Sequence, residues 1–138
     1  MCILNYINGV RPIEPNEKAI KFRVYLFSVF GIHLIFGFAL MIFKSFFQGF
    51  GEMANSLVFL LYATMGFHFR PLLMYILINC FIQTIRLRDL GYFLQTGRQI
   101  GGENLKEFIP WVVLIVFYFI DTWLAFSAYR EFKALYCE

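Results

Sequence analysis

Uncharged, largely apolar segments alternate with short polar segments along this chain. Segment 24–43 lies between Arg23 and Lys44 and has no formal charge, and segment 108–129 carries a single one, Asp121. Each has roughly the 20 residues that a helix needs to cross a bilayer. The pattern therefore predicts a membrane-spanning helix in each of these two segments.

Two further segments, 53–69 and 71–94, occupy the middle of the chain. The second is uncharged only to Ile85, and it reaches spanning length if its helix continues through Arg86, Arg88 and Asp89, whose arginines can extend to the headgroups. Arg70 and Pro71 separate the two segments, because proline disfavours a helical conformation for the residue before it and a charge is costly in hydrocarbon. We therefore expect a tight hairpin at this corner and four spans in total. The alternative is one long, kinked helix through Arg70-Pro71, which would leave three spans.

The predicted fold is an all-α integral membrane protein, with four transmembrane helices in an antiparallel bundle and short polar arms. The N-terminal arm is 1–23, in which Asn16 is placed to cap a helix that begins at Glu17 and runs into the first span. The C-terminal arm is the short charged tail 130–138, expected to continue the last helix. Four spans would place both arms on the same side of the membrane.

A polar connector is expected between the first two spans. It covers 44–52, and Gly49 and Gly51 are expected to interrupt the helix there. The last two spans are joined by a second, glycine-containing polar segment, 95–107.

The composition fits a membrane environment and argues against several function classes. Hydrophobic residues make up 60% of the chain and charged residues 15%, against about 45–50% and about 25% in soluble domains. A net charge of +3 without a run of Lys and Arg does not indicate a nucleic-acid partner. Cys2, Cys80 and Cys137 lack the spacing of a metal or redox motif. Since no nucleotide-binding, zinc-protease or hydrolase motif occurs, we expect no enzyme activity, cofactor, metal or small-molecule substrate.

One polar side chain in each predicted span forms a candidate intramembrane layer. His33, Tyr62, Asn79 and Asp121 lie roughly 10–14 Å from the membrane side that carries the termini, at about 1.5 Å per residue. An unpaired Asp in hydrocarbon is costly or protonated, and a shared layer would give it partners. We interpret the layer as a structural clasp that sets helix register. The alternative interpretation is a short proton or ion pathway.

Basic residues near the other membrane side form a second candidate site. Arg86 and Arg88, next to Asp89, fit a helix end whose long side chains reach the headgroups and form an internal ion pair. Completed by Arg98 or Lys106, they would instead form a pocket for an anionic phospholipid such as cardiolipin. Phospholipids are therefore expected partners.

Three functions fit these features. We favour a non-catalytic accessory subunit of a large multi-subunit membrane complex, such as a respiratory or ATP-synthase assembly of the mitochondrial inner membrane, in contact with other membrane subunits. Small size, little extramembrane mass and the lack of a catalytic motif favour it. The first alternative is a four-span trafficking or sorting protein of the ER and Golgi membranes. The second is a small proton or ion transporter that uses Asp121 and His33.

Overall fold

The computed structural model describes residues 14–43, 45–96 and 108–136, and over these ranges the chain is helical without a strand. The elements in chain order are α2 (Glu17–Phe43), α3 (Phe46–Asn55), the π-helix η1 (Ser56–Leu61), α4 (Tyr62–Gly66), α5 (Phe69–Thr96) and α6 (Phe108–Ala134). The predicted all-α class is confirmed for the described ranges. Because α3, η1 and α4 follow one another without a gap, 46–66 is one continuous helical segment.

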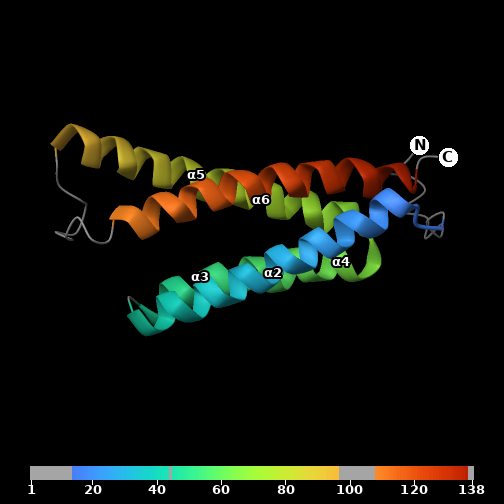
Figure 1. The fold of residues 1–138 in the computed structure, drawn as a ribbon, viewed down its shortest axis with the longest axis horizontal. Helices are drawn as coiled ribbons and strands as arrows, with labels where there is room; N and C mark the ends of the chain where they lie inside the picture. Colours follow the sequence, from blue (N-terminus) through green and yellow to red (C-terminus); the bar gives the residue numbers. More distant parts are fainter. Residues whose placement is uncertain (1–13, 44, 97–107, 137–138) are drawn as a thin grey trace.

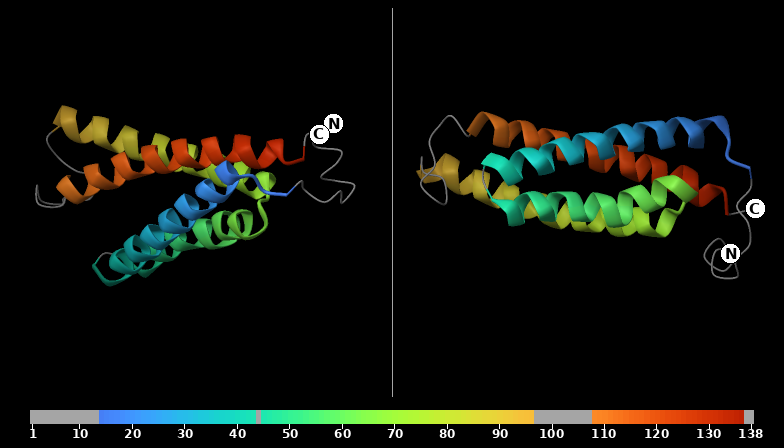
Figure 2. Two further views of the ribbon diagram at one scale, coloured as in Figure 1. Left: turned by 45° about the vertical axis from the view of Figure 1, so that its right-hand side comes forward. Right: turned by 90° about the horizontal axis from the view of Figure 1, so that it is seen from below.

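The helices form two hairpins that pack against each other (Figure 1). α2 lies along α3, η1 and α4 in the first hairpin, and α5 lies along α6 in the second. α2 also contacts α6, and α5 contacts η1, so the four helical segments share one core. The hairpins close together where α2 begins and α6 ends, and diverge where α3 begins and α5 ends (Figure 2). We call these two parts the closed half and the open half.

An abrupt reversal at Phe67 and His68 joins the two hairpins. Phe67 has a left-handed backbone with φ of 55°, and the His68 N–H donates to the Ala63 carbonyl at 2.9 Å. Pro71 follows in the first turn of α5. Backbone N–H groups in the first turn have no intrahelical partner, so the N–H that proline lacks is not needed there. The expected hairpin therefore forms, but its break lies at Phe67 and His68, just before Arg70-Pro71, which belong to α5. No single helix joins 53–66 to 71–94.

The second apolar segment starts its helix earlier than expected. Residues 46–52, predicted as part of the connector, form the first turns of α3. Gly49 lies within this helix and allows it to pack closely on α2, because a Cβ at Gly49 would overlap the carbonyl oxygen of Gly37. Glycines of this kind let two helix backbones approach closely. Gly51 also lies within α3, so neither glycine interrupts the helix, and the prediction of a connector over 44–52 is wrong from residue 46 onward.

Both predicted arms are partly helical. The side-chain oxygen of Asn16 accepts a hydrogen bond from the Ala19 N–H at 2.8 Å, which satisfies one of the free donors at the start of α2. This confirms the predicted cap before Glu17. At the other end, α6 continues to Ala134, as expected for the start of the C-terminal tail.

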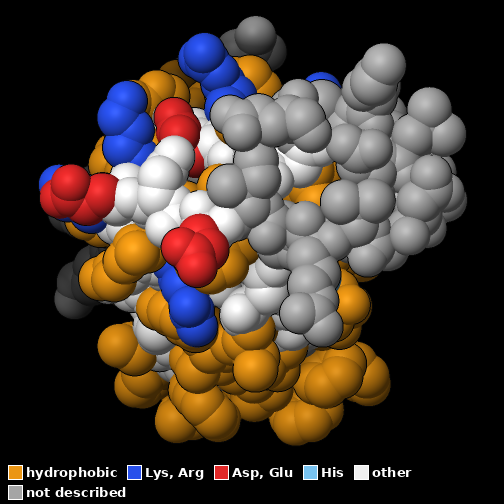
Figure 3. All heavy atoms as spheres, turned by 90° about the vertical axis from the view of Figure 1, so that its right-hand side faces the viewer, with side chains coloured by type: hydrophobic (Ala, Val, Ile, Leu, Met, Phe, Trp, Pro, Cys, Tyr) orange, Lys and Arg blue, Asp and Glu red, His pale blue; other side chains and the backbone are white. Residues whose placement is uncertain are grey.

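The exterior of the bundle is largely apolar. Among the described residues, Glu17–Phe43 and Val112–Ala134 are the two helices long and apolar enough to cross a membrane by length and composition. Large apolar side chains such as Ile35, Phe81 and Trp123 are exposed along the sides of the bundle. Charged side chains gather on part of the end where α2 begins and α6 ends, above an apolar edge (Figure 3). Apolar sides with a charged end are typical of helices that lie in a membrane.

The interior of the closed half is also apolar. All four helical segments contribute side chains to this interior. The fully buried ones include Leu26, Leu60, Ala63, Leu72, Ala125, Ala128 and Phe132. The rings of Phe67 and Phe132 meet edge to face, with centroids 5.2 Å apart. Packing therefore holds the hairpins together here, whereas the interior beyond it is polar.

Candidate functional site: a buried charged network and its cavity

His33 on α2 lies at the centre of a buried charged network. Its Nδ1 is 3.1 Å from Oε1 of Glu52 on α3, and its Nε2 is 2.9 Å from Oδ2 of Asp121 on α6. The three side chains are 1%, 4% and 0% exposed. An ionised carboxylate only accepts hydrogen bonds, so with both acids ionised His33 donates from both nitrogens as an imidazolium. One positive charge then lies between two negative charges.

Two side chains of α5 also bind Asp121, both at Oδ2, whereas its Oδ1 is buried without a hydrogen-bond partner among the described residues. The Tyr75 hydroxyl donates to Oδ2 of Asp121 at 2.6 Å, and Nδ2 of Asn79 donates to the same oxygen at 3.0 Å. The Tyr75 hydroxyl is also 2.6 Å from Nε2 of His33. Tyr75 and Asn79 are four residues apart, so they project from the same face of the helix.

Glu52 connects this core to the open half of the bundle. The Tyr118 hydroxyl donates to Oε1 of Glu52, and Nη2 of Arg86 donates to Oε2 at 3.2 Å. The Arg86 guanidinium also lies over the Tyr118 ring, 4.2 Å from its centroid. With His33 as an imidazolium, the network of His33, Glu52, Arg86 and Asp121 has no net charge. Such pairing reduces the desolvation cost of burying these groups.

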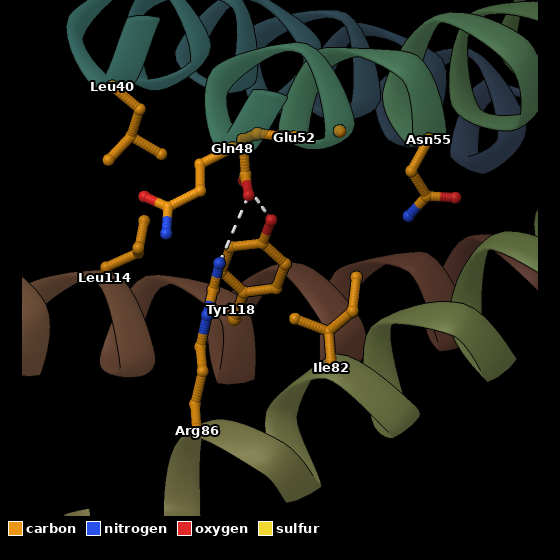
Figure 4. Close-up of a pocket in the computed structure, with 9 residues that line it drawn as sticks. Leu40, Gln48, Glu52, Asn55, Ile82, Arg86, Leu114 and Tyr118 are labelled. Carbon is orange, nitrogen blue, oxygen red and sulfur yellow. Dashed lines mark hydrogen bonds and ion pairs between the residues drawn. The ribbon is translucent and has the colours of Figure 1, made fainter. Parts of the chain in front are cut away.

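A cavity of about 350 Å³ adjoins the Glu52–Arg86 pair (Figure 4). Its walls come from α2, α3, α5 and α6, so it lies between the two hairpins. The lining residues are Leu40, Gln48, Gly51, Glu52, Asn55, Ile82, Arg86, Leu114 and Tyr118. Polar side chains reach into this space from α3 and α5, and leucine and isoleucine side chains form apolar walls (Figure 4). Apolar walls with a few convergent polar groups are typical of small-ligand sites.

The structure brings together three of the four residues in the predicted layer. His33, Asn79 and Asp121 meet in the network, but Tyr62 does not join them. Tyr62 is 55% exposed, and its ring stacks on His68 with the centroids 4.9 Å apart. Depth along a helix does not determine which way a side chain faces, and Tyr62 faces outward. Asn55 contributes in its place, donating from Nδ2 to Oδ1 of Asn79 at 2.9 Å.

Two central residues of the network were missed in the sequence. Glu52 was assigned to the edge of a connector, and Tyr75 lies in an apolar segment where a tyrosine draws little attention. A signal for Tyr75 does exist: Tyr75, Asn79, Gln83 and Arg86 recur at spacings of four, four and three residues. Such spacing marks a polar stripe along one helix face.

The predicted headgroup residues lie in different surroundings. Arg86 turns into the bundle toward Glu52, and its side chain is 16% exposed. Arg88 is 72% exposed and pairs with Asp89 at 2.9 Å, which is the ion pair expected at this helix end. Arg98 and Lys106 lie outside the described residues.

The His, Cys, Asp and Glu side chains of the described ranges form no group of three or more that could hold a metal ion. In the network, His33 already directs both ring nitrogens at carboxylates. Comparison of the chain with protein-family models, curated proteins and solved structures finds no match. The geometry of the network and the cavity is therefore the basis for assigning a function.

Proposed function

We propose that this chain is a four-span membrane protein, locked into one bundle by the His33 network, that acts as a non-catalytic structural subunit of a larger membrane assembly. The observation that carries the proposal is that one connected, neutral set of buried side chains draws members from α2, α3, α5 and α6. Buried polar networks of this kind specify how helices pair and in which register.

The proposed spans are the four helical segments. α2 and α6 are the two that qualify by length and composition. The continuous segment 46–66 and the helix α5 are also long enough to cross an apolar core of ~30 Å at ~1.5 Å per residue. Together they would form an up-and-down bundle with α2 beginning and α6 ending on the same side.

The exterior favours neighbours in the membrane. Phe38, Phe47, Phe81 and Trp123 are each more than half exposed. Lipid covers such side chains, but aromatic residues are also over-represented at protein interfaces. As a working assignment, we propose a respiratory or ATP-synthase assembly of the mitochondrial inner membrane, with phospholipids and other subunits as partners.

Two measurements test this proposal. Labelling of Cys2 and Cys137 with a membrane-impermeant reagent should place both on one side of the membrane, since an even number of spans returns the chain to its starting side. Native electrophoresis in mild detergent should show the chain in a large complex whose other subunits mass spectrometry identifies. Opposite labelling, or migration as a free 16 kDa species, would contradict the proposal.

Proton exchange is the second candidate, and one observation favours it. Glu52 adjoins the cavity, and hydrogen bonds of 3.1 and 2.9 Å through His33 connect it to Asp121. Beyond Asp121, however, the described core of the closed half is apolar, so the connected path reaches one side only. If the chain carries protons, liposomes containing it should show a pH-driven proton flux that Asp121→Asn abolishes while the bundle stays folded. Equal flux with the variant would exclude this role.

A further inference from the structure

Arg23 on α2 has no carboxylate partner among the described residues. Its guanidinium lies over two aromatic rings instead, 5.6 Å from the Phe27 centroid and 5.1 Å from the Phe67 centroid. The guanidinium N–H groups make no hydrogen bond within the described ranges, and they are not among the polar atoms that the bundle buries without a partner. Arg23 therefore presents accessible, charged donors that need an acceptor.

The aromatic rings hold the guanidinium in a defined place. Phe67 is the left-handed residue of the corner, it is 9% exposed, and its ring packs against Phe132 on α6. Phe27 lies four residues after Arg23 on α2, so the two side chains share one face of the helix. Stacking on rings restricts the orientation of a guanidinium and leaves its N–H groups for hydrogen bonds in the guanidinium plane.

The arginines at the opposite end of the bundle differ from Arg23. Arg86 pairs with Glu52 at 3.2 Å, and Arg88 pairs with Asp89 at 2.9 Å. Their charges are therefore already neutralised within the chain, whereas the charge of Arg23 is left for an external anion.

The surroundings of Arg23 are positively charged overall. Residues 14–23, 68–70 and 130–134 contain six Lys or Arg and three Glu, so this end carries an excess of positive charge. Charged side chains gather at this end above an apolar edge (Figure 3). A bound anion is attracted by such an excess, beyond what Arg23 itself provides.

An apolar stripe on α2 extends from Arg23 away from the charged end. Its members are Val24, Phe27 and Ile35, which are 57%, 38% and 69% exposed. A ligand that binds Arg23 with an anionic group can therefore place a hydrocarbon chain along the same helix.

We infer that Arg23 binds the phosphate of an anionic phospholipid, with an acyl chain of that lipid along the apolar stripe of α2. The fork of guanidinium N–H groups matches the oxygens of a phosphate. The depth of the site agrees, and this step rests on the proposed membrane bundle. Arg23 immediately precedes the charge-free segment 24–43, so it lies where the apolar core of the bilayer meets the headgroups.

The test uses the full-length chain purified in detergent and titrated with phosphatidylglycerol or with phosphatidylcholine, with bound lipid counted by native mass spectrometry. Arg23→Gln removes the proposed phosphate ligand, and Arg23→Lys keeps the charge without the planar fork. Arg88→Gln is a control matched in residue type, since Arg88 is exposed and paired with Asp89. Lys21→Gln is a control for charge at the same end, because Lys21 is exposed and pairs with Glu17. Circular dichroism checks that each variant is folded.

We expect the wild type to bind phosphatidylglycerol more tightly than phosphatidylcholine. Arg23→Gln should weaken binding of phosphatidylglycerol about 10-fold, because a hydrogen-bonded charge pair is lost, and Arg23→Lys should weaken it by a smaller factor. Both controls should bind within about 2-fold of the wild type.

Three results would overturn the inference. The wild type could bind the two lipids equally, Arg23→Gln could bind phosphatidylglycerol normally, or Lys21→Gln could weaken binding as much as Arg23→Gln, which would indicate general attraction to the charged end. The titration requires neither a larger complex nor a particular number of spans, so its failure is distinct from failure of the topology and complex tests.

Discussion

In the closed half of the bundle the hairpins meet through side chains such as Leu26, Leu72 and Phe132, whereas toward the open half they meet through His33, Glu52 and Asp121. The first kind of contact depends on shape and tolerates small shifts between helices. The second depends on the direction of each hydrogen bond and tolerates little. The comparison teaches that helix proximity and helix register are controlled in different parts of this molecule.

Divergence of the hairpins explains why the open half is polar. As the helices separate, short apolar side chains no longer span the gap, and Arg86 and Glu52 bridge it from opposite hairpins. The same separation leaves the cavity beside them. A polar bridge and a space for a ligand are therefore two results of one geometric feature.

The largest effect is expected from Asp121→Leu. Leucine would leave the groups on His33, Tyr75 and Asn79 that now contact the carboxylate without their shared partner. Removing one member of a buried charged set costs about 3–5 kcal/mol. Asp121→Asn keeps a hydrogen-bonding group and should cost about 1–2 kcal/mol. Unfolding in mixed detergent micelles measures the cost of each substitution. Equal costs for the two variants would contradict the role proposed for the Asp121 side chain in holding the helices in register.

A somewhat smaller effect is expected in the closed half from Leu72→Ala. Leu72 is fully buried among apolar neighbours, and truncation of such a residue costs about 2–3 kcal/mol at the lower end of the usual range. Because the closed half has no part in the network, Leu72→Ala and Asp121→Asn should be additive within about 0.5 kcal/mol in the same unfolding assay. Strong coupling between them would mean that the two halves are not separate.

The sequence predicts the helices of this molecule better than its site. Largely apolar segments and Arg70-Pro71 indicate the helical segments and the corner, because helix length and proline chemistry are local properties. The identity of the network depends on helix rotation, which is set by contacts distant in the chain. Tyr62 and Glu52 show this difference: Tyr62 has a suitable depth and faces outward, while Glu52 seemed to lie in a connector and faces inward.

Two tyrosine variants, one inside the network and one outside it, test the same account with a smaller expected effect. Tyr75→Phe removes a hydroxyl that donates to Asp121 in a buried position, and should cost about 1–2 kcal/mol. Tyr62→Phe removes an exposed hydroxyl outside the network and should cost less than about 0.5 kcal/mol. The same micelle unfolding assay compares them. A larger cost for Tyr62→Phe than for Tyr75→Phe would mean that the Tyr62 hydroxyl does take part in the predicted intramembrane layer.

The most direct test of the account is a double-mutant cycle between His33 on α2 and Asp121 on α6. Stability in mixed micelles is measured for His33→Leu, Asp121→Leu and the double variant, with His33→Leu combined with Tyr62→Phe as the control pair. If His33 links the two hairpins through Asp121, the coupling free energy should be about 1–3 kcal/mol, and the control pair should be additive within about 0.5 kcal/mol. Additive effects for His33 and Asp121 would contradict the claim that this network locks the bundle.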